Sequence, residues 1–235
     1  MKLDINLGRN YVRINVDRAV IICHGLPYEP GSAIDKSYDS LAEFFSKRGI
    51  PAVVFDFSGT GKSQGSFSLI SWLEDLESIA ENFDEVHVVG FSMGGAVAYA
   101  FENAESYSII SSPFSPDMFS EGMLREIYSN ALLKGTLRGI RDYETFRRRF
   151  VEEFQSIAPS SVRPKKDVLV VHAIDDEVVP FDQGERIFRY SKRPKKFVRV
   201  ENGGHFLRRS EKVIELAYRW VSEKREGEEV ETIRI

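Results

Sequence analysis

The sequence is poor in cysteine and contains no long apolar run. Cys23 is the only cysteine among 235 residues, which excludes an internal disulfide and is typical of a small packing residue in an apolar strand. Apolar residues nowhere follow one another over the ~18 positions that a membrane-spanning helix needs. The first residues alternate between apolar and polar, unlike the continuous apolar centre of a secretory signal. We therefore expect a cytoplasmic protein without stable membrane insertion.

An excess of basic charge is missing as well. The formal net charge is −4 and the chain has no basic stripe with interleaved aromatic residues, so nucleic acid is not an expected partner. The four histidines, at positions 24, 87, 172 and 205, include no pair at metal-ligand spacing. We accordingly predict that the protein uses neither a metal ion nor another cofactor.

What the sequence does contain is a repeated alternation of apolar strands and amphipathic helices. A capping box at Ser71 and Glu74, for example, predicts that a helix begins at Ser71. Such alternation predicts an α/β fold with a mainly parallel, twisted sheet and helices on both faces. With 42% apolar residues, we predict one domain over residues 1–235. Short apolar runs that predict strands are found at residues 19–23, 52–55, 86–89, 107–110, 168–172 and 197–200.

The two ends of the chain carry further strand signals. Residues 223–235 form a highly charged tail that we expect to be frayed; the alternative is that residues 230–235 pair as an edge strand. At the other end, two sets of alternating apolar residues flank the turn residues 8–10 and predict a β-hairpin: Leu3, Ile5 and Leu7, then Val12, Ile14 and Val16.

The segment around Ser92 has the G-x-S-x-G pattern of a nucleophile elbow. A β-branched run leads into Gly-Phe-Ser-Met-Gly at residues 90–94, and an Ala- and Gly-rich helical segment follows at once. Strand, sharp turn and helix are the context that this motif requires, and the strained turn holds the serine out at the edge of the sheet. Gly90 and Gly94 flank Ser92 because a Cβ atom there would collide with the returning chain. The alternative for the pentapeptide alone is a tight turn with a capping serine.

An acid and a histidine follow later in the chain. Asp175 and Asp176 come after the strand at 168–172, and Gly-Gly-His at residues 203–205 comes after the next strand. Serine, then acid, then histidine is the order of the α/β hydrolases and differs from the orders in chymotrypsin and subtilisin. With these motifs the sequence resembles the α/β-hydrolase superfamily, in particular its small single-domain serine esterases and lipases. Relatives similar to prolyl oligopeptidase or to monoacylglycerol lipase share the same signature.

The resemblance implies a role for each of these residues. Ser92 is the expected nucleophile, His205 the general base and Asp176 the acid that orients the histidine. In hydrolases of this type the acid lies four residues before the proline of an Asp-x-x-Val-Pro segment. Because that proline is Pro180 here, the pattern selects Asp176, and Asp175 becomes a turn residue.

The resemblance also implies an oxyanion hole. Many α/β hydrolases carry His-Gly after the strand that this chain has at 19–23, and the following residue donates a backbone N–H, which here is that of Leu26. The second expected donor is the backbone N–H of Met93, directly after Ser92. For His24 itself we favour a structural role that holds the loop glycine in place.

Residues 56–63 have two interpretations. Gly-Lys-Ser at residues 61–63 is similar to the end of a phosphate-binding P-loop, but that motif needs a glycine where the chain has Asp56. The segment also matches the hydrolase pattern Asp-x-x-Gly-x-Gly-x-Ser, in which glycines turn the chain beneath the active-site edge. The chain departs from the family at Ser58, where arginine is common, and at Thr60, where histidine is common. We favour the hydrolase interpretation.

Between residues 113 and 163 the alternation of strands and helices stops. Apolar residues at helical spacing predict two or three helices, one of which has Asp142 as its N-cap. The α/β hydrolases often insert a helical cap over the active site here, and we expect the same of residues 113–163. We expect most of its apolar side chains to serve packing. Arg147, Arg148 and Arg149 are flanked by glutamates, which favours a solvated helix face over a site for an anionic substrate.

The sequence therefore predicts a serine hydrolase, most similar to a carboxylesterase. It would cleave esters of small to medium, fairly apolar acyl or aryl groups through an acyl-enzyme on Ser92. The expected partner is a small-molecule ester. The sequence does not decide whether the protein forms a homodimer. The alternatives are a serine peptidase or amidase, a lysophospholipase or monoacylglycerol lipase, and a binding protein that has lost activity. The presence of Ser92, Asp176 and His205 argues against the last.

Overall fold

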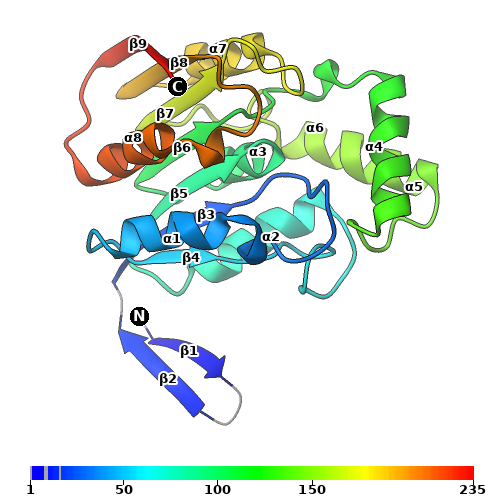
Figure 1. The fold of residues 1–235 in the computed structure, drawn as a ribbon, viewed down its shortest axis with the longest axis horizontal. Helices are drawn as coiled ribbons and strands as arrows, with labels where there is room; N and C mark the ends of the chain where they lie inside the picture. Colours follow the sequence, from blue (N-terminus) through cyan, green and yellow to red (C-terminus); the bar gives the residue numbers. More distant parts are fainter. Residues whose placement is uncertain (1, 8–9, 16) are drawn as a thin grey trace.

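The main sheet has seven parallel strands in the part of the chain that the structure describes. This structure is a computed structural model, and it describes residues 2–7, 10–15 and 17–235. The strand order is β4-β3-β5-β6-β7-β8-β9 (Figure 1). The strands are β3 (Arg18–Cys23), β4 (Ala52–Val54), β5 (Glu85–Phe91), β6 (Ser106–Ile110), β7 (Val168–Ala173), β8 (Lys195–Glu201) and β9 (Glu228–Arg234).

The central strands of this sheet are buried on both faces. Ile21 and Cys23 of β3 belong to one apolar cluster, whereas Val20 and Ile22 belong to a second cluster on the opposite face. Side chains alternate between the two faces of a strand, so a strand that is covered on both sides needs a continuous apolar run. The apolar runs of the sequence thus correspond to the strands of a covered parallel sheet.

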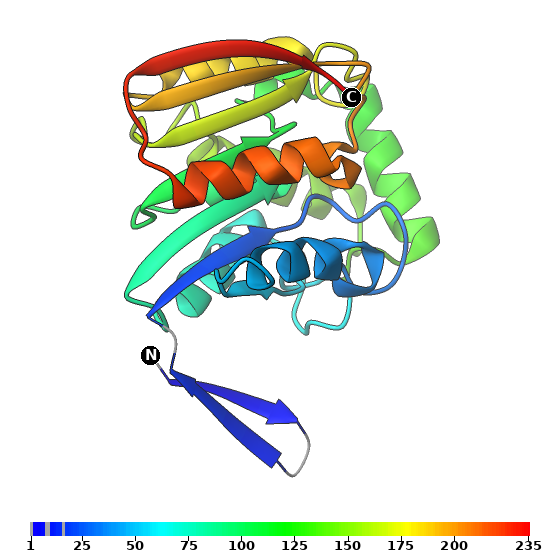
Figure 2. The same cartoon turned by 60° about the vertical axis from the view of Figure 1, so that its left-hand side comes forward.

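Helices cover each face of the sheet (Figure 2). The helices α1 (Tyr38–Ser46) and α8 (Glu211–Ser222) pack on the face that carries Val20 and Ile22. On the face that carries Ile21 lie α2 (Leu69–Ala80), α3 (Met93–Ala100) and α7 (Phe181–Tyr190), of which α7 was not predicted. The predicted parallel sheet with helices on both faces is confirmed. No helix in the described ranges is long and apolar enough to cross a membrane.

The start of α2 differs from the prediction. Ser68, not Ser71, is the N-cap, and its hydroxyl oxygen accepts a hydrogen bond from the backbone N–H of Ser71 at 3.1 Å. One oxygen of the Glu153 carboxylate, 84 residues away from Leu69 in the sequence, accepts hydrogen bonds from the Ser68 hydroxyl and the Leu69 N–H, both at 2.8 Å. A carboxylate at a helix N-terminus satisfies N–H groups that have no partner within the helix. The helix therefore begins one turn earlier, and Trp72 becomes fully buried.

Helices occupy the segment between β6 and β7, as predicted for residues 113–163. It contains α4 (Glu121–Lys134) and a second helical stretch made of α5 (Tyr143–Arg147), the π-helical turn Arg148–Glu152 and α6 (Glu153–Ile157). The Asp142 carboxylate accepts a hydrogen bond from the Thr145 N–H at 2.7 Å, which confirms Asp142 as the N-cap of the second stretch.

The second helical stretch is anchored by aromatic packing. Phe146 and Phe150 are fully buried, and the ring of Phe67, which precedes α2, lies 6.1 Å from the first and 6.3 Å from the second. Arg149 donates hydrogen bonds to the carbonyl oxygens of Phe67 and Gly139. As expected, this part of the segment serves mainly to pack the segment against the domain.

The ends of the chain form strands. β1 (Lys2–Leu7) and β2 (Asn10–Asn15) pair as an antiparallel two-stranded sheet, whereas residues 8, 9 and 16 of the predicted hairpin lie outside the described residues. The expectation of a frayed tail is wrong and the alternative, an edge strand, is confirmed, because β9 pairs along its whole length with β8 at the edge of the sheet (Figure 2). The Lys196 ammonium lies 3.3 Å from the carboxylate of Glu229 and 3.1 Å from that of Glu231. Backbone pairing and these charges hold the tail.

The role of Glu153 at the start of α2 can be tested by substitution. We expect Glu153→Ala to lower the free energy of unfolding by about 1–2 kcal/mol, because the Ser68 hydroxyl and the Leu69 N–H lose their acceptor. The matched control is Glu152→Ala at the exposed neighbouring position, for which we expect a change below ~0.5 kcal/mol. Urea-induced unfolding of both variants measures the difference, and equal effects would contradict this role.

Candidate active site

The residues that the sequence singled out meet at the carboxyl edge of the sheet. Ser92 follows β5, Asp176 follows β7 and His205 follows β8. The chain passes from β3 outward to β4 and then returns to the other side of β3 with β5, so the strand order reverses between β3 and β5. In open parallel sheets, ligand sites form in the crevice beyond such a reversal, at the carboxyl ends of the strands.

Ser92 sits in a strained turn between β5 and α3. Its backbone has φ 52° and ψ −128°, a conformation that L residues rarely adopt. The close approach of neighbouring backbone requires the flanking glycines. A Cβ atom on Gly94 would lie 2.2 Å from the carbonyl oxygen of His24, and one on Gly90 would lie 2.6 Å from the carbonyl oxygen of Gly94. The sequence motif therefore corresponds to a physical constraint on the turn.

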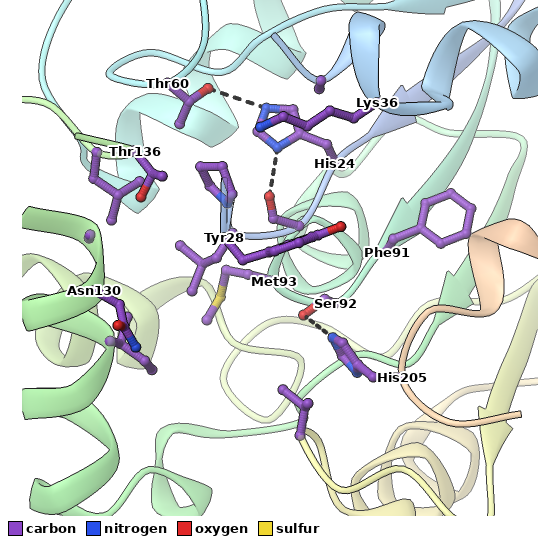
Figure 3. Close-up of a pocket in the computed structure, with 18 of the residues that line it drawn as sticks. His24, Tyr28, Lys36, Thr60, Phe91, Ser92, Met93, Asn130, Thr136 and His205 are labelled. Carbon is purple, nitrogen blue, oxygen red and sulfur yellow. Dashed lines mark hydrogen bonds between the residues drawn. The ribbon is translucent and has the colours of Figure 1, made fainter. Parts of the chain in front are cut away.

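Ser92, His205 and Asp176 form a continuous chain of hydrogen bonds. His205 Nδ1 lies 2.9 Å from Oδ2 of Asp176. Its Nε2 lies 3.2 Å from the hydroxyl oxygen of Ser92, and Figure 3 marks this second contact. Because a carboxylate only accepts, Nδ1 carries the proton that is donated to Asp176. The Nε2 lone pair then faces the Ser92 hydroxyl. In this arrangement the histidine can take a proton from the serine.

The carboxylate of Asp176 is buried and well supplied with donors. Its Oδ1 accepts hydrogen bonds from the N–H groups of Val178 and Val179, each at 2.9 Å. Burial by itself raises the pKa of this carboxyl, but the hydrogen bonds from His205 and from the Val179 N–H, with His172 Nε2 a further 3.5 Å contact, hold the pKa far below its ordinary value. Asp176 is therefore an anion at neutral pH beside the imidazole.

Asp175 has a positioning role that the sequence did not reveal. It occupies the predicted turn after β7, but its carboxylate also accepts hydrogen bonds from the N–H groups of Gly203 at 2.9 Å and Gly204 at 3.3 Å. These glycines belong to the turn that presents His205, in which Asn202 has φ 58°. Asp175 thus ties the loop after β7 to the loop after β8. The two adjacent aspartates therefore have different tasks.

The loop after β3 carries the residues expected to form an oxyanion hole. His24 is buried; its Nε2 accepts a hydrogen bond from the Phe57 N–H at 3.1 Å, so its Nδ1 donates to the Gly25 carbonyl oxygen at 2.7 Å. The structural role expected for His24 agrees with these bonds. Leu26 and Met93 both line the cavity at Ser92. In the described ranges, neither of their N–H groups donates to a protein acceptor.

The conformation of the loop at residues 56–63 is fixed by hydrogen bonds to charged side chains. The carboxylate of Asp56 accepts hydrogen bonds from the N–H groups of Ala33 at 2.7 Å and Lys62 at 2.8 Å. A Cβ atom on Gly61 would lie 2.2 Å from this carboxylate, which explains the glycine. Arg138, which the sequence did not single out, donates hydrogen bonds to three carbonyl oxygens of the loop. The loop is therefore built around an aspartate and an arginine, unlike a P-loop.

A cavity of about 600 Å³ opens at Ser92 (Figure 3). One side of it comes from the segment between β6 and β7 and combines apolar side chains with Glu126, Asn130, Lys134 and Thr136. Arg147, Arg148 and Arg149 do not line this cavity. In the described part of the chain, no three histidine, cysteine or acidic side chains gather as a metal site would require. The apolar side chains on this wall are Phe119, Met123, Ile127, Ala131 and Leu137.

Comparison with known proteins agrees with this architecture. Residues 20–216 match the model of the alpha/beta hydrolase family, and the chain belongs to this family. It is thus a member of the α/β-hydrolase superfamily, and hydrolysis is the activity that this membership supports. A search of curated proteins returns no match.

Solved structures share the fold at low sequence identity. An alpha-beta serine hydrolase homologue from Coxiella burnetii is 24% identical, with a TM-score of 0.54 over 89% of this chain and 86% of that one. The monoacylglycerol lipase of Paleococcus ferrophilus is 18% identical, with a TM-score of 0.58 over 86% and 94%. Est1E from Butyrivibrio proteoclasticus, solved with ferulic acid bound, is 18% identical, with a TM-score of 0.60 over 88% and 90%.

The lowered pKa of Asp176 predicts a pH dependence of stability. Because the folded pKa lies below the ~3.9 of an unfolded aspartate, the stabilisation is complete above this value and is lost as the pH falls toward the folded pKa. We expect the difference in free energy of unfolding between the wild type and Asp176→Asn to shrink as the pH falls from about 4.5 to about 3. Denaturant titrations at each pH measure it. A difference that grows over this range would contradict the assignment.

Proposed function

We propose that this protein is a serine hydrolase that cleaves carboxylic esters of small to medium, fairly apolar acyl or aryl groups. The observation that carries the proposal is the chain of hydrogen bonds from Ser92 through His205 to Asp176, beside a cavity that is partly lined by apolar side chains. Nucleophile, base and orienting acid in hydrogen-bond reach of one another are the arrangement that acyl transfer needs.

Proton transfer begins at the serine. His205 Nε2 takes the proton from the Ser92 hydroxyl as its oxygen attacks the ester carbonyl carbon. The C–O bond to the alcohol then breaks, and the proton on Nε2 passes to the departing alcohol oxygen, which leaves an acyl group on Ser92. A water molecule, deprotonated by the same nitrogen, then attacks the acyl carbon. The bond from the acyl carbon to the Ser92 oxygen breaks, the proton on Nε2 returns to this oxygen, and the acid leaves. Asp176 stabilises the imidazolium in each step without being protonated.

Negative charge that develops on the carbonyl oxygen needs donors. In our proposal these are the backbone N–H groups of Leu26 and Met93, which lie on the cavity wall and have no protein acceptor in the described residues. Met93 is also the first residue of α3, so its N–H lies at the positive end of the helix dipole. One such donor typically contributes about 3 kcal/mol of transition-state stabilisation.

The proposed substrate class follows from the segment between β6 and β7. We propose that residues 113–163 act as a cap, because α4 contributes Met123 and Ile127 to the cavity wall while Phe146 and Phe150 are anchored elsewhere. An apolar wall suits an alkyl or aryl acyl chain, and a cavity of about 600 Å³ holds a small to medium substrate.

Reaction with an active-site probe tests the proposal directly. We expect a fluorophosphonate to label Ser92 and the protein to cleave p-nitrophenyl esters faster than aminoacyl anilides of similar size. We also expect Ser92→Ala to lower kcat by at least ~10³-fold because the nucleophile is lost. The midpoint of thermal unfolding should be almost the same for Ser92→Ala as for the wild type. Faster cleavage of anilides would favour a peptidase or amidase, and absence of labelling on the folded protein would favour a binding protein.

The choice between the two aspartates has its own test. Asp176→Asn should lower kcat/KM by about 10³- to 10⁴-fold, since the imidazole loses the partner that fixes its tautomer. Asp175→Asn is the matched control: its amide oxygen can still accept one of the two glycine N–H bonds, and we expect a loss below about tenfold. Initial rates with one p-nitrophenyl ester compare the two variants. The reverse order of effects would make Asp175 the acid.

A further inference from the structure

Arg208 is a buried cation on the wall of the cavity. It lies three residues after His205, its side chain is only 8% exposed, and it lines the same cavity as Ser92. Burial of a guanidinium is costly unless its N–H groups and its charge are matched by acceptors and an anion. The surroundings of Arg208 therefore indicate what the cavity is built to hold.

The guanidinium of Arg208 is surrounded by aromatic rings rather than by hydrogen-bond acceptors. Its central carbon lies 4.9 Å from the ring centre of Phe206, 5.4 Å from that of Tyr38 and 5.9 Å from that of Tyr28. One Nη donates to the Tyr28 hydroxyl at 3.3 Å, whereas the buried Nε has no hydrogen-bond partner in the protein. Rings stabilise the charge through their faces but accept no conventional N–H bond.

The other buried basic side chains show the contrast. In the described part of the chain, Lys165 and Lys195 are the other buried lysine or arginine residues. The Lys165 ammonium lies 2.8 Å from the Glu102 carboxylate, and that of Lys195 lies 3.8 Å from the Glu228 carboxylate. No carboxylate among the described residues lies within 4.0 Å of Arg208. Arg208 is thus the buried cation without an acidic partner, and it is the one that faces the cavity.

The position of Arg208 relates it to one end of the substrate. In the proposed reaction His205 gives its proton to the departing alcohol, so the alcohol lies on the His205 side. The Phe206 ring lies 5.5 Å from the His205 ring and 4.9 Å from the Arg208 guanidinium. Asn130 of α4 lies across the cavity from His205 (Figure 3). In the proposed orientation, the alcohol points toward Arg208 and the acyl chain points toward the apolar side chains of α4 that line the cavity.

We propose that Arg208 binds an anionic group, a carboxylate or a phosphate, on the alcohol portion of the substrate. The inference rests on the proposed ester hydrolysis and narrows its substrate class to esters of an apolar acid with an anionic alcohol. A planar guanidinium with free N–H groups suits such a ligand, because carboxylates and phosphates can accept two parallel hydrogen bonds from it.

Lys36 also lines this cavity and lies beside His24 (Figure 3). Its ammonium donates to the carbonyl oxygen of Glu29. Asp56, an acid on the same wall, already accepts hydrogen bonds from the N–H groups of Ala33 and Lys62. Two further acids, Glu126 and Glu177, also line the cavity, but both are exposed. Among the described residues, Arg208 therefore remains the buried cation on this wall that has no paired carboxylate.

Two matched pairs of esters test the proposal. The first pair is the butyryl ester of 3-hydroxybenzoate and that of 3-hydroxybenzamide, which differ in charge at nearly constant shape. The second pair is 1-butyrylglycerol 3-phosphate and 1-butyrylglycerol. We expect the wild type to prefer the anionic member of at least one pair by about tenfold or more in kcat/KM. The preferred pair identifies carboxylate or phosphate, and ratios near one for both pairs would overturn the proposal.

Substitutions then assign the preference to this arginine. Arg208→Gln should reduce the anionic-to-neutral ratio by about 10- to 100-fold, the contribution of a charge-assisted two-point hydrogen bond. Arg208→Lys, which keeps the charge but not the planar guanidinium, should reduce this ratio less. If Arg208→Gln does not fold, the ratio measured for Arg208→Lys tests the proposal instead. The matched control is Arg209→Gln: Arg209 also donates to the Tyr28 hydroxyl but is exposed. An equal loss in the Arg209 variant, or an unchanged ratio in both Arg208 variants, would contradict the proposal.

A binding measurement separates this inference from the proposed function. Titration calorimetry of Ser92→Ala with 3-hydroxybenzoate and with glycerol 3-phosphate reports the anion site without turnover. We expect at least one of them to bind, and to bind at least ~10-fold more weakly when Arg208→Gln is added. If the wild type cleaves no ester but this difference is found, the proposed function fails and the anion site stands. If esters are cleaved and neither anion binds, the anion site fails and the proposed function stands.

Discussion

The close approach of α3 to the end of β3 is the constraint on which the rest of the site depends. Ser92 can hold its strained backbone only because Gly94 lets α3 lie against the carbonyl oxygen of His24. On the other side of the turn, Gly25 lies so close that a Cβ atom there would be 2.9 Å from the Cβ of Ser92. These contacts fix the serine hydroxyl, and with it the point at which the cavity meets His205.

The histidine is held by a second set of contacts, which involve β7 and the loops after β7 and β8. Asp176 binds the imidazole, and Asp175 binds the turn that carries it. The fully buried side chain of His172 donates a hydrogen bond to the carbonyl oxygen of Val179. The backbone N–H of Val179 in turn donates to the carboxylate of Asp176. The geometry of the site thus depends on backbone and carboxylate groups that have few alternative partners.

One part of the segment between β6 and β7 anchors it to the rest of the domain, and another part lines the cavity. Its second helical stretch is bound to the domain by the buried phenylalanines and by Glu153 at the start of α2. Arg138, which lies between α4 and α5, joins the segment to the loop at residues 56–63. α4 contributes Met123, Ile127 and Ala131 to the cavity wall, and Arg208 lines the same cavity. In our proposal, these two parts of the wall bind the acyl chain and the alcohol of an ester.

The sequence by itself determined the features that depend on local chemistry. Continuous apolar runs located the strands, and the glycines around Ser92 identified the turn. The resemblance to hydrolases with an Asp-x-x-Val-Pro segment favoured Asp176 over Asp175. The tertiary structure alone decided where distant groups meet. α2 begins at Leu69 because Glu153 reaches it, and the charged tail is a strand because β8 offers an open edge. The environment of Arg208 likewise has no local signal, because the rings around it come from residues as far away as Tyr28 and Tyr38. Spacing along the chain reports the neighbours of a residue in its own helix or strand, whereas burial, charge pairing and cavity lining depend on which elements the fold places side by side.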